Sequence, residues 1–440
     1  MSKRDALVGM LPTKMQRRVE PLLEAVGLLG QVNNVNTVGS FLPSLFRGFV
    51  LRQGRNQQET SIHASYPVHF DWEYRSEFPE MKELYQRAKQ NQWDSDFALD
   101  WSTSVDPLNP EVPLLPNRFW DDVEFPRNIK LSNQEKQELT YCVCSWMLSQ
   151  FLHGEQGALY AAAQVTESVQ WMDGKLYGAT QVMDEGRHVE VFHRYIDEKL
   201  NKLYVINDNL FVIIDALVSD SRWDMKFLGM QIMVEGLALG AFGTLYRWTK
   251  EPLLKNLLRY VIQDEARHVH FGVLALREYF TEHLSDAERH EREDWAFEVA
   301  LLMRNRFLAH EVYEEWFEGM FSRKQWNEIV NRLPLMQEFR EVMFCRLIPN
   351  LRYIGLLSDR MMGHYERAGL WHFADGATAA EISGEQILAE LDGIDPSTVV
   401  AQNASQHAVG EPGHEGHHHS HDDHDDHDDI PDEMKAWMNR

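Results

Sequence analysis

Two short motifs made of metal-binding residue types recur in the chain. They occupy residues 184–188 (Asp-Glu-Gly-Arg-His) and residues 264–268 (Asp-Glu-Ala-Arg-His), lie 80 positions apart and differ only at the middle residue. Thirty positions before the Glu of each motif stands another glutamate, Glu155 for the first and Glu235 for the second. Residues three apart on a helix share a face, so each Glu-x-x-His pair can bind one ion. The spacing therefore predicts a duplicated metal-binding unit.

The predicted ligand set combines four carboxylates with two imidazoles. Four buried carboxylates cannot all stay ionised unless cations compensate them, and two divalent ions would neutralise the cluster. Mixed oxygen and nitrogen ligands suit iron or manganese better than zinc. We expect two iron ions, with a manganese/iron pair left open. The predicted ligands are Glu155, Glu185, His188, Glu235, Glu265 and His268.

The repeat, and not the single motif, carries this prediction. Glu-x-x-His occurs five times in the chain, so one instance has little weight. The pair Glu190 and His193 illustrates this point, because adding 80 to position 190 leads to His270 and not to a glutamate.

The residues around the motifs predict long helices. Ser132 followed by Glu135 is a capping-box signal, and Pro252 fits the first turn of a helix. Two helical hairpins, each offering a Glu and a Glu-x-x-His, predict an all-α fold with a four-helix bundle and additional helices. The expected helices cover about 132–163, 167–201, 207–219, 224–249, 252–283, 286–320 and 322–346.

The chain divides into three expected regions. Residues 1–130, rich in Trp and Pro, form an N-terminal extension wrapping the bundle, and residues 131–371 form the helical domain. Residues 372–440 are small, polar and acidic, which is typical of a disordered tail. Whether the His/Asp run at 417–429 binds metal is left open.

Bulk composition excludes several classes of function. The net charge of −25 argues against nucleic acid as a partner. Three cysteines are too few for a disulfide framework and indicate a reducing compartment, so we expect a cytoplasmic protein. The chain begins without an apolar run typical of a signal peptide, and no uninterrupted apolar stretch predicts a membrane span.

The six ligands resemble those of the ferritin-like, ribonucleotide-reductase-like di-iron carboxylate superfamily. The paired motifs are most similar to its oxygenase members, such as the hydroxylase subunits of bacterial di-iron monooxygenases. The resemblance covers about residues 135–285 and implies a ferritin-like bundle and a homodimer. It also implies that Asp184 and Asp264 accept hydrogen bonds from the imidazoles of the opposite motif, and that Arg187 and Arg267 neutralise those aspartates. An ordinary intrahelical ion pair is the alternative for each arginine.

Departures from the family pattern narrow the expected reaction. Radical-generating reductase subunits place a Tyr seven residues after the first Glu-x-x-His glutamate, where this chain has Phe192. Monooxygenase hydroxylases and acyl desaturases usually place a Thr one turn beyond the third-helix glutamate, where this chain has Ala238 and Leu239. A tyrosyl radical at position 192 is therefore excluded, and delivery of protons needs a donor other than that Thr.

The expected function is an O2-activating di-iron oxidoreductase, a hydroxylase or monooxygenase with O2 as co-substrate and a small organic molecule as substrate. The chain has no Gly-x-Gly-x-x-Gly after a strand and no cysteine cluster, so electrons must come from a separate reductase or ferredoxin. Acyl desaturation or another di-iron oxidation is an alternative, and so is ferroxidase or metal handling. Candidate walls of a substrate cavity are Trp146, Phe151, Met183, Phe192 and Phe242.

Overall fold

The computed structural model describes residues 11–28, 31, 34–56, 59–121 and 123–396. These residues form helices and loops without any strand, which confirms the predicted all-α class. The described residues through Pro396 belong to one compact unit. This unit includes the described parts of the expected N-terminal extension (1–130) and of the expected helical domain (131–371).

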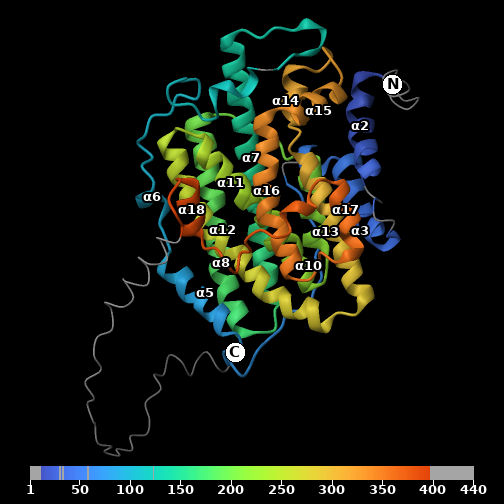
Figure 1. The fold of residues 1–440 in the computed structure, drawn as a ribbon, viewed down its shortest axis with the longest axis vertical. Helices are drawn as coiled ribbons and strands as arrows, with labels where there is room; N and C mark the ends of the chain where they lie inside the picture. Colours follow the sequence, from blue (N-terminus) through green and yellow to red (C-terminus); the bar gives the residue numbers. More distant parts are fainter. Residues whose placement is uncertain (1–10, 29–30, 32–33, 57–58, 122, 397–440) are drawn as a thin grey trace, which may run out of the picture. The chain divides into compact units, whose positions relative to one another are not determined.

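Four long helices in the centre of this unit carry the predicted ligands (Figure 1). They are α7 (Asn133–Ser168), α8 (Met172–Tyr195), α11 (Glu235–Trp248) and α12 (Pro252–Glu278). Helix α7 packs along α8, and α11 packs along α12, so the two repeated segments form two helix pairs. The pairs meet where α8 contacts α12.

The starts of these helices follow the sequence signals. The Ser132 hydroxyl accepts a hydrogen bond from the Glu135 N–H at 3.2 Å, and the Glu135 carboxylate accepts one from the Ser132 N–H at 2.7 Å. Pro252 lies in the first turn of α12, and the side chain of Glu251 accepts from two N–H groups of that turn at 2.9 and 2.7 Å. Both caps satisfy donors that a helix leaves free at its start.

The predicted helix at 224–249 contains a π-helical segment. It consists of α10 (Trp223–Phe227), the π segment η5 (Leu228–Val234) and α11. A π turn adds a residue to the helical turn and shifts the face on which later side chains lie, and such segments are common at functional sites. This segment ends immediately before Glu235.

Two other predicted helices are interrupted. The helix expected at 286–320 is α13 (Asp286–Arg306) and α14 (His310–Trp316), separated where Ala309 takes a φ of 47°. The helix expected at 322–346 is α15 (Arg323–Arg332) and α16 (Pro334–Tyr353). A proline disfavours helical geometry in the residue before it, so Pro334 ends α15 and starts α16.

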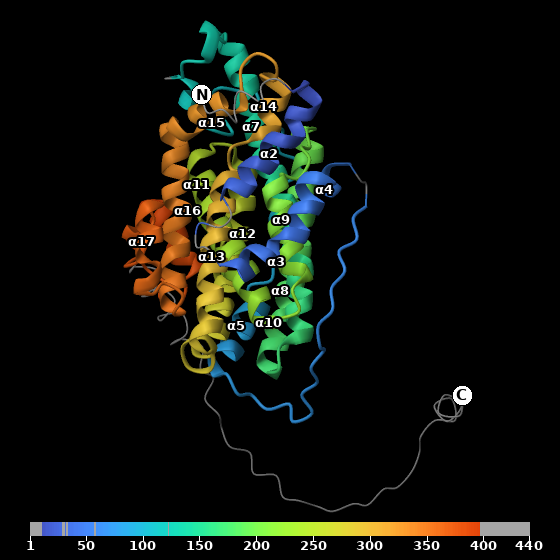
Figure 2. The same ribbon diagram turned by 90° about the vertical axis from the view of Figure 1, so that its right-hand side faces the viewer.

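The described residues among the N-terminal 130 form helices and loops, as predicted. Helix α3 contacts α9 and α13, and α5 packs on both α8 and α12 (Figure 2). The elements are α2 (Thr13–Leu28), α3 (Val35–Leu45), η1 (Phe46–Val50), α4 (Gln53–Asn56), α5 (Pro79–Gln90), α6 (Ser95–Ala98), η2 (Asn117–Trp120) and η3 (Pro126–Asn128). Connecting elements further along are η4 (Ile196–Leu200), α9 (Asp208–Ser219) and η6 (Tyr279–His283).

The prediction of a disordered tail from residue 372 is wrong for its first part. After α17 (Asp359–Arg367) and η7 (Trp371–Phe373), helix α18 (Gly384–Leu391) packs against α11 and α12. Ser383 caps α18, and Ile387 and Leu388 are buried, so a short amphipathic helix lies within a polar stretch. The remainder of the tail, including the run at 417–429, lies outside the described residues.

One described stretch, Trp223–Trp248, is long and apolar enough to cross a membrane by length and composition. In its most apolar window, 94% of the residues are buried inside the protein. The stretch thus serves as a core helix in this fold, and Glu235 lies within it.

Candidate metal centre

The six predicted ligands converge in the protein interior, although their helices are far apart in sequence. Helix α7 supplies one glutamate, α8 supplies a Glu-x-x-His pair, and α11 and α12 repeat this arrangement. Ligand atoms of the first group lie within 4.8 Å of one another, as do those of the second. The first group is Glu155, Glu185, His188 and Glu265, and the second is Glu185, Glu235 and His268. All six residues are buried.

Two glutamates, Glu185 and Glu265, lie between the two imidazoles. The Oε1 atom of Glu185 is 3.0 Å from Nδ1 of His268, and its Oε2 atom is 3.5 Å from Nδ1 of His188. Glu265 mirrors this arrangement, with Oε1 3.2 Å from Nδ1 of His188 and Oε2 3.7 Å from Nδ1 of His268. Each of these carboxylates therefore presents one oxygen to either half of the site, which is the geometry of a bridging ligand.

Several buried atoms of the predicted ligands have no hydrogen-bond partner among the residues that the structure describes. They are Oε2 of Glu185, Oε2 of Glu235, both carboxylate oxygens of Glu265 and Nδ1 of His268. Buried acceptors without partners cost free energy, and so many together are unusual in a folded interior. Cations held by these oxygen and nitrogen atoms would satisfy all of them. The donor set thus fits a pair of iron or manganese ions.

The directions in which burial and neighbouring charges shift the pKa values of these glutamates and histidines show that the metal-free cluster retains protons. Burial, with repulsion from nearby carboxylates, raises the pKa of Glu155 and Glu235 well above the ordinary 4.5. Burial lowers the pKa of His188 and His268, but the facing carboxylates outweigh it and raise both well above 6.5. Burial also acts to raise the pKa of Glu185, yet the two imidazoles outweigh it and hold it low. Protons thus balance the charge of the site when no metal is bound.

The aspartates before the ligand glutamates contact the imidazoles of the opposite motif. The Oδ2 atom of Asp264 is 3.1 Å from Nε2 of His188, and Oδ2 of Asp184 is 3.3 Å from Nε2 of His268. These are the contacts that the family resemblance implies. An imidazole that donates from Nε2 to a carboxylate presents Nδ1 as the metal-binding atom, so the aspartates set the tautomer.

The arginines of the two motifs neutralise those aspartates in more than one way. Arg187 pairs with Asp184 on its own helix and also lies 3.3 Å from Asp264 on α12. Arg267 pairs with Asp264 on its own helix and lies 3.7 Å from Asp184. Both the intrahelical pairing and the predicted pairing across the two helices are therefore present.

Two residues outside the repeat complete this outer layer, and sequence reasoning missed them. Nε2 of Gln92 donates to Asp184 at 3.0 Å, and Nε1 of Trp93 donates to Asp264 at 2.8 Å. Gln92 also accepts from Arg187 at 2.9 Å, and the guanidinium carbon of Arg187 lies 4.6 Å from the centre of the Trp93 ring. Both follow α5 in the N-terminal segment, so this segment contributes to the site and does more than cover the bundle. Nothing in their local sequence signals this role.

Trp93→Phe is expected to weaken metal binding by about 10-fold, because it removes the N–H donated to Asp264 and keeps an aromatic ring beside Arg187. Competition with a metal chelator measures the affinity. Trp101→Phe is a matched control, since the Trp101 indole also donates at 2.8 Å, to a backbone carbonyl, and Arg194 lies 4.3 Å from its ring. An equal loss in both variants would contradict the role of Trp93.

A buried glutamine contacts two of the predicted ligands, and a second glutamine contacts the first. Nε2 of Gln181 is 3.0 Å from Oε1 of Glu235 and 3.4 Å from Oε1 of Glu185. Gln231, in the π segment, donates to Gln181 at 3.4 Å. Each glutamine stands four residues before a ligand glutamate, and this spacing was the available signal in the sequence. The 80-residue repeat does not extend to them, because Val261 corresponds to position 181.

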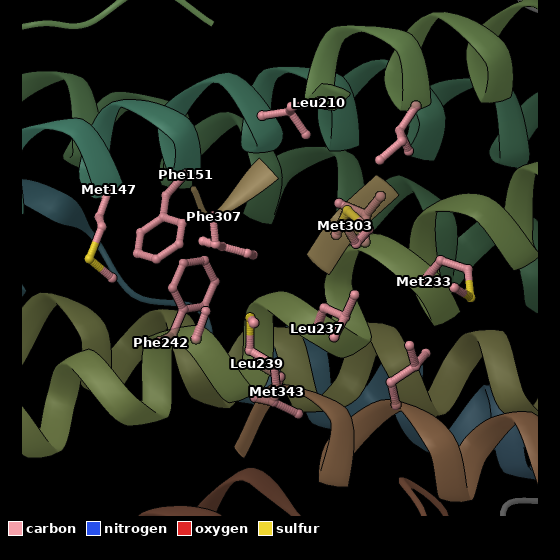
Figure 3. Packing of buried hydrophobic residues seen from close by; sticks show 14 of the residues in the cluster. Met147, Phe151, Leu210, Met233, Leu237, Leu239, Phe242, Met303, Phe307 and Met343 are labelled. Carbon is pink, nitrogen blue, oxygen red and sulfur yellow. The ribbon is translucent and has the colours of Figure 1, made fainter. Parts of the chain in front are cut away.

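Four of the five candidate wall residues are buried in the core, and their role as walls of a cavity stays a prediction. Phe151 and Phe242 pack edge to face at 4.8 Å and Phe192 stacks on Phe242 at 5.7 Å, which forms an aromatic cluster between the helix pairs (Figure 3). The indole of Trp146 is buried and donates to Glu311 at 2.8 Å. The Met183 prediction is wrong: its side chain is 62% exposed, because it lies on the outer face of α8.

The chain matches no protein-family model and no curated protein. The support for a metal centre is therefore internal to the molecule. It consists of a repeated ligand set, its convergence on buried unpartnered atoms, and aspartates that orient both imidazoles.

Proposed function

We propose that the protein is an O2-activating di-iron oxidoreductase built on a ferritin-like four-helix bundle of α7, α8, α11 and α12. The observation that carries this proposal is the convergence of two glutamates and two Glu-x-x-His pairs on one buried point. The proposed reaction is hydroxylation or another oxygen insertion into a small organic substrate.

In this proposal each half of the site holds one iron. Glu155 and His188 bind the first ion, and Glu235 and His268 bind the second. The two remaining glutamates of the set bridge them, in keeping with their position between the imidazoles. Two bound Fe(II) ions would supply electrons for the reduction of O2.

The surrounding side chains would control water and protons. The cluster of Phe151, Phe192 and Phe242 is buried and would limit access of water to one side of the site. Gln181 and Gln231 offer hydrogen bonds beside Glu235, at a site that lacks the Thr of related hydroxylases. Gln181 would hold the carboxylate of Glu235 in place, Gln231 would position Gln181, and the pair could anchor a water that delivers protons.

Further parts of the proposal rest on the sequence. Electrons would come from a separate reductase or ferredoxin, and the protein would act in the cytoplasm as a homodimer. Acyl desaturation or another di-iron oxidation uses the same ligands and remains an alternative. Ferroxidase activity is the alternative from another class, and the His/Asp run at 417–429 favours it.

Stopped-flow oxidation of Fe(II) separates these classes. We expect about two irons per chain to bind and to be oxidised, after which the reaction stops, because the site has ligands for two ions. Metal analysis with Mössbauer spectroscopy of the purified protein distinguishes an iron pair from a manganese/iron pair. Oxidation that continues well beyond two irons per chain, with mineral formation, would replace the oxygenase proposal with ferroxidase.

A further inference from the structure

A buried arginine at the end of α13 has no ion pair. Arg306 is 2% exposed, and none of the described acidic residues lies within ion-pair distance of it. Its Nε atom has no hydrogen-bond partner, and Nη1 reaches a weak acceptor, the sulfur of Met303, at 3.7 Å. Its guanidinium carbon lies 4.5 Å from the centre of the Phe307 ring. A buried charge without a counterion raises the free energy of the folded state, so an anion bound beside Arg306 would stabilise it.

This arginine belongs to the surroundings of the metal centre. Burial lowers the pKa of Arg306 to about 9, and the metal ligand Glu155 is the carboxylate that acts in the opposite direction. The charge of Glu155 therefore acts on Arg306, although the two side chains form no ion pair. Glu155 is committed to the metal centre in our proposal, so it does not serve as the counterion of Arg306.

Two further arginines, Arg304 on α13 and Arg340 on α16, also lack acidic partners in the described part of the chain. Nε and Nη2 of Arg340, on α16, are buried without hydrogen-bond partners. Burial and the nearby charge of Arg304 lower the pKa of Arg340 to about 10.

The interior beside Arg306 is apolar and rich in methionine. Figure 3 shows Met303 of α13, and Phe307 directly after the end of that helix, among side chains from α7, α9, η5, α11 and α16. Phe151 in this group lies one helical turn before Glu155. Methionine side chains are flexible and repack easily around apolar guests. The labelled members are Met147, Phe151, Leu210, Met233, Leu237, Leu239, Phe242, Met303, Phe307 and Met343.

We propose that Arg306 binds the carboxylate of an organic acid whose apolar body enters the methionine-rich interior beside Glu155. The proposal deepens the proposed function and rests on it, since it names the substrate class of the same site. A carboxylate would satisfy the free N–H groups of the guanidinium with charge-assisted hydrogen bonds. The apolar body would pack among the methionine side chains, which can rearrange around it, and it would lie toward the metal ligands.

Isothermal titration calorimetry of the full-length chain tests this assignment. Octanoate and phenylacetate are the acidic probes, and octanamide and phenylacetamide are their neutral counterparts. We expect at least one acid to bind and its amide to bind about 10-fold more weakly or worse, because the amide lacks the charge. Arg306→Met should weaken binding of the acid by a similar factor. The control Arg352→Gln, at an exposed arginine paired with Asp375, should leave it unchanged.

Thermal unfolding of Arg306→Met separates a binding role from a structural one. The melting temperature should be unchanged or higher, because the substitution removes an uncompensated buried charge. Binding of neither acid, or equal binding in the wild-type protein and Arg306→Met, would overturn the proposal. A loss of metal affinity in Arg306→Met with unchanged acid binding would also overturn it. These titrations use metal-free protein and measure only binding of the acid. Failure of acid binding would overturn the assignment of Arg306 and leave the proposed function standing if the protein still binds iron and consumes O2. Acid binding without iron binding or O2 consumption would instead contradict the proposed function.

Discussion

Glu235→Ala is expected to abolish O2 consumption and to lower the metal content of the purified protein. Glu235 is 2% exposed, and its Oε2 atom has no partner among the described residues, so this buried oxygen is free to bind a metal ion. Loss of residues that merely orient metal ligands costs about 10- to 100-fold in affinity or activity, and loss of a ligand should cost at least as much. Metal analysis and an oxygen electrode measure the two effects.

Glu190→Ala provides the matched control for this variant. Glu190 also belongs to a Glu-x-x-His pair, but its side chain is exposed and no repeat partner stands 80 positions later. Metal content and O2 consumption should stay near the wild-type values. Equal losses in the two variants would show that the repeat does not identify the ligands.

Metal binding is expected to stabilise the protein more at pH 8 than at pH 6. Without metal, the pKa values of Glu155, Glu235, His188 and His268 are all raised in the folded state. The folded state therefore holds protons that the unfolded chain has released. Stability falls as pH rises wherever the folded state binds more protons, by about 1.4 kcal/mol per pH unit for each proton retained.

The pH window follows from the ordinary pKa values of these groups. The glutamates begin to destabilise the metal-free fold above their ordinary value of 4.5, and the histidines above 6.5. Glu185 and Asp264 have lowered pKa values and therefore the opposite sign. Their contribution is lost only as pH falls below the ordinary values of 4.5 and 3.8, so it stays constant between pH 6 and pH 8.

Thermal unfolding at pH 6, 7 and 8, with and without Mn(II), measures this effect. Metal binding displaces the protons of the ligands, so the loaded protein should lose less stability as pH rises, and proton release should be detectable in weak buffer. A difference between loaded and metal-free protein that shrinks with rising pH would contradict the assignment of these four groups.

The sequence determined the six clustered residues and most of the helices because both depend on local spacing. The 80-residue repeat identified all six residues that the fold brings together, and a three-residue spacing places Glu and His on one face of any helix. The sequence analysis missed two helix interruptions, at Ala309 and at Pro334. At each of them a single residue ends a helix inside an otherwise helical pattern.

The tertiary structure alone decided which residues surround the ligands. Gln92 and Trp93 lie more than 90 positions before the aspartates they contact, and only the packing of α5 on α8 and α12 brings them there. The absence of any ion pair at Arg306, within the described chain, likewise follows from what packs around it. A periodic pattern specifies which face of a helix is buried, whereas the partner of that face depends on how all the helices pack, and no local spacing encodes this.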